Sequence, residues 1–157
     1  MKHARFLGLA LIAVLTVASS FAASQLPDDP ERILDRYVEA YNHGDADLLA
    51  SLYGDDARIL PQGRSMVHGQ RNIEAFWKRR LSLEAPSRGR GSRVVAQILD
   101  KGAGPDIGYV VASMDAPVGE AYNFTLCLKR NLRGQWRIAA EMWNEDSPRF
   151  HLVPAEK

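Results

Sequence analysis

The hydrophobic residues of the first half of the chain recur at the spacing of amphipathic helices. Asp29 and Pro30 form a typical helix start, and Gly44 is a typical C-terminal cap. Asp45 is then expected to cap a second, short helix, and a third helix is predicted from about Arg71 to Leu83. The apolar positions of these three helices are Ile33, Leu34, Tyr37, Val38 and Tyr41; Leu48, Leu49, Leu52 and Tyr53; and Ile73, Phe76, Trp77 and Leu81.

The second half of the chain has the alternation and the β-branched and aromatic content of strands. Residues 93–99, 107–114, 121–130 and 136–144 fit this description, and turns rich in Gly, Pro, Asp and Asn separate them. Two shorter extended segments, residues 57–60 and 65–68, flank a turn at residues 61–63, and residues 84–92 are predicted to be a loop. Helices followed by hairpin-connected strands indicate an α+β domain with its helices on one face of an antiparallel sheet.

A different pattern occupies the first 22 residues. Lys2 and Arg5 precede an apolar run of about a dozen residues, and small residues follow up to Ala23. This layout is typical of a cleaved secretory signal peptide, and the run is shorter than the roughly 20 residues that span a bilayer. We therefore expect a secreted or periplasmic protein with no stable membrane anchor, an uncleaved anchor being the alternative. The domain is expected over residues 29–146, followed by a tail at 147–157.

The composition argues against nucleic-acid binding, a disulfide framework and a metal site. The 157 residues include 20 Lys or Arg and 19 Asp or Glu, so a formal net charge of +1 gives no electrostatic reason to expect a nucleic-acid partner. A single cysteine, Cys127, excludes an internal disulfide framework and a Cys-rich metal site. The four histidines lack the spacing of metal ligands. We therefore expect neither a metal ion nor another cofactor.

Five short motifs occur in a characteristic order. They are YVEAYNHGD at residues 37–45, LYGDDA at 52–57, HG at 68–69, IEAFW at 73–77 and WRIAAEMW at 136–143. Together they resemble the nuclear transport factor 2-like superfamily, which includes SnoaL-like and ketosteroid-isomerase-like domains. The resemblance covers residues 29–146. It implies a cone-shaped, curved antiparallel sheet closed by three N-terminal helices, often in a homodimer, with a pocket for a small apolar molecule.

The same resemblance implies candidate chemistry. In ketosteroid isomerases a tyrosine of the first helix and a neutral acid on a late strand stabilise an enolate, while an aspartate moves the proton. Tyr37 matches the tyrosine. The region that should hold the aspartate, residues 58–61, has no carboxylate, and the late-strand acid falls near Leu126. The sequence therefore does not support a steroid-isomerase mechanism.

Two other side chains are candidates for acid–base chemistry. His68 precedes the third helix, where it either faces the pocket or bonds to the backbone as a loop residue. Glu141 shares one face of the last strand with Trp143 by alternation, whereas hydrophobicity favours the opposite face, which includes Trp136, as the core. A bulge or a dimer-covered outer face would reconcile the two. Facing the core, Glu141 is a buried carboxyl with a raised pKa; otherwise it lies at the surface or at a dimer rim.

The expected pocket wall is largely aromatic, although core packing explains these residues equally well. The candidate ligand-binding residues are Tyr37, Tyr41, Ile59, Phe76, Trp77, Tyr122, Phe124 and Trp143. Asp55 and Asp56 are interpreted as turn and capping residues. The basic stretch from Lys78 to Arg93 is interpreted as a solvated helix end and loop, and Cys127 as a structural residue on a polar strand face.

Three functions remain open. The first is an exported small domain that binds a mostly apolar molecule in a conical pocket. The second is a cofactor-free isomerase, cyclase or hydratase that uses Tyr37 with His68 or Glu141. The third is a dimeric interaction module with a vestigial cavity. The binding function predicts that a ligand stabilises the protein, and the enzyme predicts a pH-dependent rate. The interaction module predicts a stability that depends on protein concentration.

Overall fold

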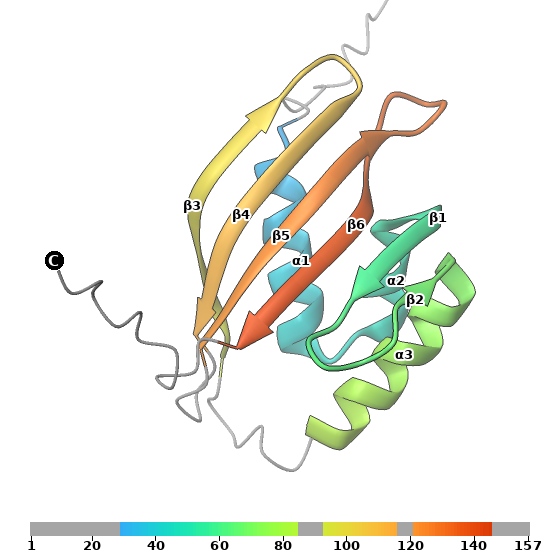
Figure 1. The fold of residues 1–157 in the computed structure, drawn as a ribbon, viewed down its shortest axis with the longest axis vertical. Coiled ribbons are helices and arrows are strands. Elements are labelled where there is room, and N and C mark those ends of the chain that lie inside the picture. The colour runs from blue at the N-terminus through green and yellow to red at the C-terminus, as the bar shows by residue number, and fades with distance from the viewer. Residues whose placement is uncertain (1–28, 85–92, 116–120, 146–157) are drawn as a thin grey trace, which may run out of the picture.

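The computed structural model describes residues 29–84, 93–115 and 121–145 of the chain (Figure 1). The signal peptide expected at residues 1–22 and the tail expected at 147–157 lie outside these ranges. The elements are α1 (Glu31–His43), α2 (Ala46–Ser51), β1 (Tyr53–Leu60), β2 (Val67–His68), α3 (Gln70–Glu84), β3 (Val95–Ala103), β4 (Ile107–Asp115), β5 (Ala121–Arg130) and β6 (Trp136–Glu145). In the described ranges, no helix combines the length and the hydropathy needed to cross a membrane.

The strands form one curved, unclosed sheet in the order β2-β1-β6-β5-β4-β3. Neighbouring strands are antiparallel, except that β1 and β6 run parallel. The helices lie on one face of the sheet, with α1 behind β4–β6 and α3 beside β1 and β2 (Figure 1). The predicted α+β class is thus confirmed, and the one parallel pair modifies the predicted antiparallel pattern.

The capping interactions that the sequence predicts near the helix ends are present in the structure. The Asp29 carboxylate accepts a hydrogen bond from the backbone N–H of Glu31 at 3.0 Å, and the Asp45 carboxylate accepts one from Leu48 N–H at 2.8 Å. Gly44 ends α1 with φ of +70°, a left-handed conformation in which a side chain would be strained. These caps separate α1 and α2 by a turn, so that both helices can pack on the same sheet.

One boundary prediction is wrong. The short second helix ends at Ser51, so Tyr53 begins β1 instead of belonging to the helix. Asp55 and Asp56 therefore lie exposed within a strand, not in a turn. Tertiary pairing of Tyr53 with Ile138 of β6 overrides the helical spacing of the local sequence.

A β-bulge divides β6 into two halves. Cys127 of β5 pairs with Ala140, whereas the next residue, Leu128, pairs with Ile138. Ala139 therefore has no partner on β5, and β6 carries one extra residue at this point. The bulge that could reconcile the conflicting patterns of this strand is present.

The bulge reverses which face of β6 is buried. Before it, Trp136 and Ile138 face the core; after it, Glu141 and Trp143 do so, while Met142 is 56% exposed on the opposite face. A strand alternates with a period of two residues, so one additional residue moves the following side chains to the other face. Hydrophobicity therefore predicts the buried face of the first half of β6, which includes Trp136. In the second half the buried face is the one that Glu141 shares with Trp143.

Aliphatic side chains fill much of the space between the helices and the sheet. Leu49, Leu52, Ile59, Ile73 and Ile138 are among those that are completely buried. Close packing of this kind leaves no room for a ligand. The one buried charged group of the described residues, Glu141, lies beside this core among aromatic side chains, and its surroundings are the candidate site.

Candidate functional site

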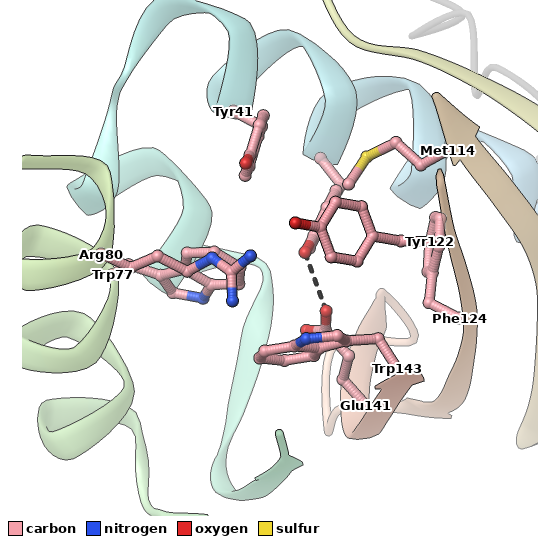
Figure 2. A pocket seen from close by; sticks show the side chains of 9 residues that line it. Tyr41, Trp77, Arg80, Met114, Tyr122, Phe124, Glu141 and Trp143 are labelled. Atoms are coloured by element: carbon pink, nitrogen blue, oxygen red, sulfur yellow. Dashed lines mark hydrogen bonds between the residues drawn. The ribbon is translucent and has the colours of Figure 1, made fainter. Parts of the chain in front are cut away.

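Glu141 is the only polar or charged residue classed as buried in the described part of the chain, with 1% of its surface exposed. Its Oε1 accepts a hydrogen bond from the Tyr37 hydroxyl at 2.8 Å, drawn as a dashed line in Figure 2. Its Oε2 accepts a second hydrogen bond from the Tyr53 hydroxyl. The Trp77 indole N–H donates to the Tyr53 oxygen at 3.2 Å. Residues from α1, β1, α3 and β6 thus meet at one carboxyl group.

The environment moves the pKa of Glu141 into the physiological range. Burial raises this pKa to about 7, although the hydrogen bonds from Tyr53 and Tyr37 and the charge of Arg80 act in the opposite direction. Burial and the neighbouring Glu141 raise the pKa of both tyrosines well above 10. Near neutral pH the carboxyl group can therefore release or accept a proton, while the two phenols remain protonated donors.

Beside Glu141 lies a small space, which we call the chamber, enclosed mainly by aromatic rings (Figure 2). Its nine lining residues are Tyr37, Tyr41, Trp77, Arg80, Met114, Tyr122, Phe124, Glu141 and Trp143.

The rings of the chamber contact one another closely. The ring centres of Tyr37 and Phe124 are 5.9 Å apart, and those of Trp77 and Trp143 are 6.2 Å apart, both pairs stacked. The cavity that remains is about 10 Å³, which holds about one water molecule. The expectation of an open apolar pocket is therefore corrected: with the side chains in these positions, the chamber is almost filled.

Arg80 of α3 closes one side of the chamber. Its guanidinium carbon lies 5.1 Å from the ring centre of Trp143 and 5.9 Å from that of Tyr122, within the range of cation–π attraction. Its Nε lies 2.7 Å from a carboxylate oxygen of Glu84. The other Glu84 oxygen accepts a hydrogen bond from the Tyr41 hydroxyl at 2.6 Å. The cation is thus held in place by rings and by one carboxylate, with 23% of its side chain exposed.

The structure brings together most of the residues proposed for the pocket. Lining the chamber are Tyr37, Tyr41, Trp77, Tyr122, Phe124 and Trp143, with Glu141.

Two of the proposed ligand-binding residues do not line it. Ile59 is fully buried and pairs with Glu141 within the sheet, so it belongs to the packed core. Phe76 covers Trp77 and Trp143 from the outside, at ring distances of 5.3 and 5.9 Å.

The expectation that His68 faces the pocket is wrong. His68 is exposed on β2, the short edge strand, where it pairs with Arg58 of β1. Because alternation turns the preceding Val67 inward, it turns His68 outward. His68 therefore cannot act together with Tyr37 at the chamber.

Sequence reasoning missed three participants. Helical spacing predicts Tyr53 in a helix, the basic stretch that includes Arg80 is predicted to be solvated, and no pattern marks Met114. A signal for Arg80 existed, since it follows Trp77 by three residues and so lies near the same helix face. Within residues 29–84, 93–115 and 121–145, no three His, Cys, Asp or Glu side chains gather in a way that could hold a metal ion. Cys127 is exposed.

A SnoaL-like domain family model matches residues 31–142. Among solved structures, the chain is similar to a ketosteroid isomerase-like protein from Erwinia carotovora atroseptica, with 18% identity and a TM-score of 0.58, over 75% of this chain and 94% of that one. It is also similar to a putative calcium/calmodulin-dependent protein kinase type II association domain from Thiobacillus denitrificans, with 15% identity and a TM-score of 0.61, over 73% and 92%. A third similar structure is an NTF-2 like protein of unknown function from Silicibacter pomeroyi, with 15% identity and a TM-score of 0.56, over 73% and 91%.

Comparison with curated proteins finds no match. The matches confirm the resemblance to the nuclear transport factor 2-like superfamily. At identities this low the structural likeness concerns the fold alone, so function must be argued from the site.

Proposed function

The chain belongs to the SnoaL-like domain family, and from the site that it builds within this fold we propose an exported domain that binds a mostly apolar small molecule. The ligand would occupy the chamber and exchange a hydrogen bond with Glu141. The observation that carries the proposal is the buried, titratable carboxyl of Glu141 at the wall of an aromatic cavity. Such a group is costly to bury, and groups of this kind concentrate at functional sites.

Binding requires the chamber to widen, because it holds only about one water molecule in this structure. Arg80 and Met114 have long, unbranched side chains with several rotamers, so they can move without a shift of the backbone, although Arg80 must then give up its contacts with Glu84 and the rings. Arg80, Met114, Tyr122 and Trp143 also retain a little solvent exposure. The completely buried residues Leu126 and Ile138 belong to the packed core. These differences support entry on the side of Arg80 and Met114.

The first test is native mass spectrometry of the protein purified from its own host. A co-purified small molecule would identify the ligand class, and the same spectrum would report the number of subunits. A defined probe, 4-phenylbutan-1-ol, is expected to raise the melting temperature of the wild-type protein.

Matched variants assign that effect to the chamber. Glu141→Gln should bind the alcohol more weakly because an amide and a carboxyl group present different hydrogen-bonding groups, whereas the exposed His68→Ala variant should behave as wild type. Absence of both a co-purified molecule and any stabilisation by the alcohol would contradict the proposal.

A second candidate function is proton-transfer catalysis without a cofactor, such as isomerisation, cyclisation or hydration. The specific observation in its favour is the pKa of Glu141, about 7, since general acids and bases work best near the ambient pH. Tyr37 would serve as the adjacent hydrogen-bond donor. A reaction rate that follows a pKa near 7 and is lost in Glu141→Gln would establish catalysis. Ligand binding without any turnover would exclude catalysis and support only the binding function.

Export and homodimer formation also remain proposals. Export rests on the pattern of residues 1–22, and N-terminal sequencing of the protein from its host tests it.

A homodimer is supported by a row of side chains across the sheet face that points away from the helices: Leu60, Met142, Thr125 and Val111 lie opposite one another on four adjacent strands. Leu60 and Met142 are 41% and 56% exposed. Sedimentation of wild type and of Met142→Glu tests whether a second copy covers this row.

A further inference from the structure

A second hollow, which we call the outer groove, lies directly outside the chamber. Its volume is about 230 Å³, and its walls include Arg64, Arg79, Arg80, Glu84 and Trp143. Arg80 and Trp143 also line the chamber. These two side chains therefore form the wall between the chamber and the outer groove.

The two parts of this wall differ in how firmly they are held. Trp143 is stacked on Trp77 and also contacts Phe76, so moving it would disrupt the aromatic cluster. Arg80 is flexible and is held by Glu84 and by the ring faces that it covers. Arg80 is therefore the part of the wall whose rotation would join the chamber to the outer groove.

The charge of this region favours an anion. Arg64, Arg79 and Arg80 face the outer groove, against the two carboxylates of Glu84 and Glu145. Among the described residues, Glu84 is the one carboxylate within ion-pair distance of Arg80, and the contact uses Nε.

The shape of the guanidinium agrees with this charge. Figure 2 shows the terminal nitrogens of Arg80 directed into the chamber, toward Tyr122 and Trp143. A guanidinium with two free terminal amino groups matches a carboxylate in geometry and charge.

Building on the proposed binding function, we propose that the ligand is an elongated amphipathic carboxylic acid. Its apolar end fills the aromatic chamber beside Glu141, and its carboxylate pairs with Arg80 at the wall to the outer groove. Aromatic faces can also bind an organic cation. Here, however, Arg80 already covers the faces of Trp143 and Tyr122 and would repel a second positive charge.

The test uses three probes of equal length and different charge: 4-phenylbutyrate, 4-phenylbutanamide and 4-phenylbutylamine. Calorimetry of the full domain measures their dissociation constants, and the fluorescence of Trp77 and Trp143 reports entry into the chamber. Wild type should bind the acid about tenfold more tightly than the amide, the usual scale for one charge-assisted hydrogen bond. Arg80→Gln should lose this preference and still bind the amide.

Two further variants separate charge from geometry and from folding. Arg80→Lys keeps the charge without the planar fork, so its preference for the acid should be intermediate. Arg71→Gln, at the exposed other end of α3, should behave as wild type. Equal binding of acid and amide by wild type, or tightest binding of the amine, overturns the inference and leaves the binding function standing. Failure of all three probes contradicts the binding function as well.

Discussion

The two halves of β6, on either side of Ala139, bury side chains of opposite character. The first half buries the apolar side chains of Trp136 and Ile138, whereas the second half buries the carboxyl group of Glu141 next to Trp143. The change of buried face between the two halves arises from one residue of β6 that β5 does not pair. A candidate site can therefore be created by strand register alone, without a distinctive motif.

The two halves also differ in their effect on stability. Removing Ile138 from water stabilises the fold, as for any aliphatic core residue. Burying Glu141 opposes folding when the group is charged, because its pKa rises from 4.5 to about 7. The first half therefore supports the domain at every pH, whereas the second supports it least where Glu141 is ionised.

The largest expected effect comes from removing the bulge. Deletion of Ala139 should unfold the domain or cost more than about 4 kcal/mol, because either Ile138 or Glu141 must then turn to the wrong face of the sheet. Circular dichroism during urea unfolding measures this loss. Ala139→Ser, which keeps the residue count, is the control and should remain close to wild type. A stable deletion variant would show that the bulge does not determine which side chains are buried.

The next largest effect is expected within the aliphatic half. Ile138→Ala should lower the free energy of unfolding by about 4 kcal/mol, because it leaves a cavity at a completely buried position. Met142→Ala, at a largely exposed position of the other half, should change it by about 0.5 kcal/mol or less. Similar losses in both variants would mean that Met142 is covered, as in the proposed homodimer.

A smaller effect is expected from pH. The folded protein holds the Glu141 proton up to about pH 7, whereas the unfolded chain releases it near pH 4.5. The folded state therefore binds more protons between these values, so stability falls as pH rises through this window and is level above it. Relative to Glu141→Gln, wild type should lose about 2.5 kcal/mol between pH 5 and pH 8. Parallel stability curves for the two proteins would contradict the raised pKa.

The smallest effect concerns one hydroxyl group. Tyr37→Phe removes the hydrogen bond to Glu141 Oε1 and should cost about 1 kcal/mol. It should also raise the pKa of Glu141 further, because this hydrogen bond favours the ionised form. Carbon-detected NMR titration of the Glu141 carboxyl group measures the shift. Tyr41→Phe, whose hydroxyl donates to Glu84 instead, should leave the pKa of Glu141 nearly unchanged.

The features that sequence analysis predicts correctly are local ones. The caps at Asp29, Gly44 and Asp45 act within a few residues of themselves, so their chemistry is visible in the sequence. The third helix and the strands at 121–130 and 136–144 likewise follow from short-range periodicity.

The features that it misses depend on distant partners. Tyr53 becomes a strand residue because β6 pairs with it. The conflicting patterns of β6 allow a bulge, but only the pairing with β5 places it at Ala139. Arg80 lies in a charged stretch, and its place at the chamber depends on Tyr122 and Trp143, which belong to other strands. Each of these outcomes is decided by strand pairing and tertiary packing, which one-dimensional periodicity does not contain.

The parallel pairing of β1 with β6 joins the beginning of the domain to its end. Tyr37 and Glu141 are 104 residues apart, so the hydrogen bond between them forms only after the strand that carries Glu141 has been synthesised. A nascent chain that still lacks β6 must leave β1 without its central neighbour and Tyr37 without its acceptor. Contacts between such distant residues delay folding. That delay would leave the polypeptide unfolded while it is being synthesised, a condition that suits the export proposed above.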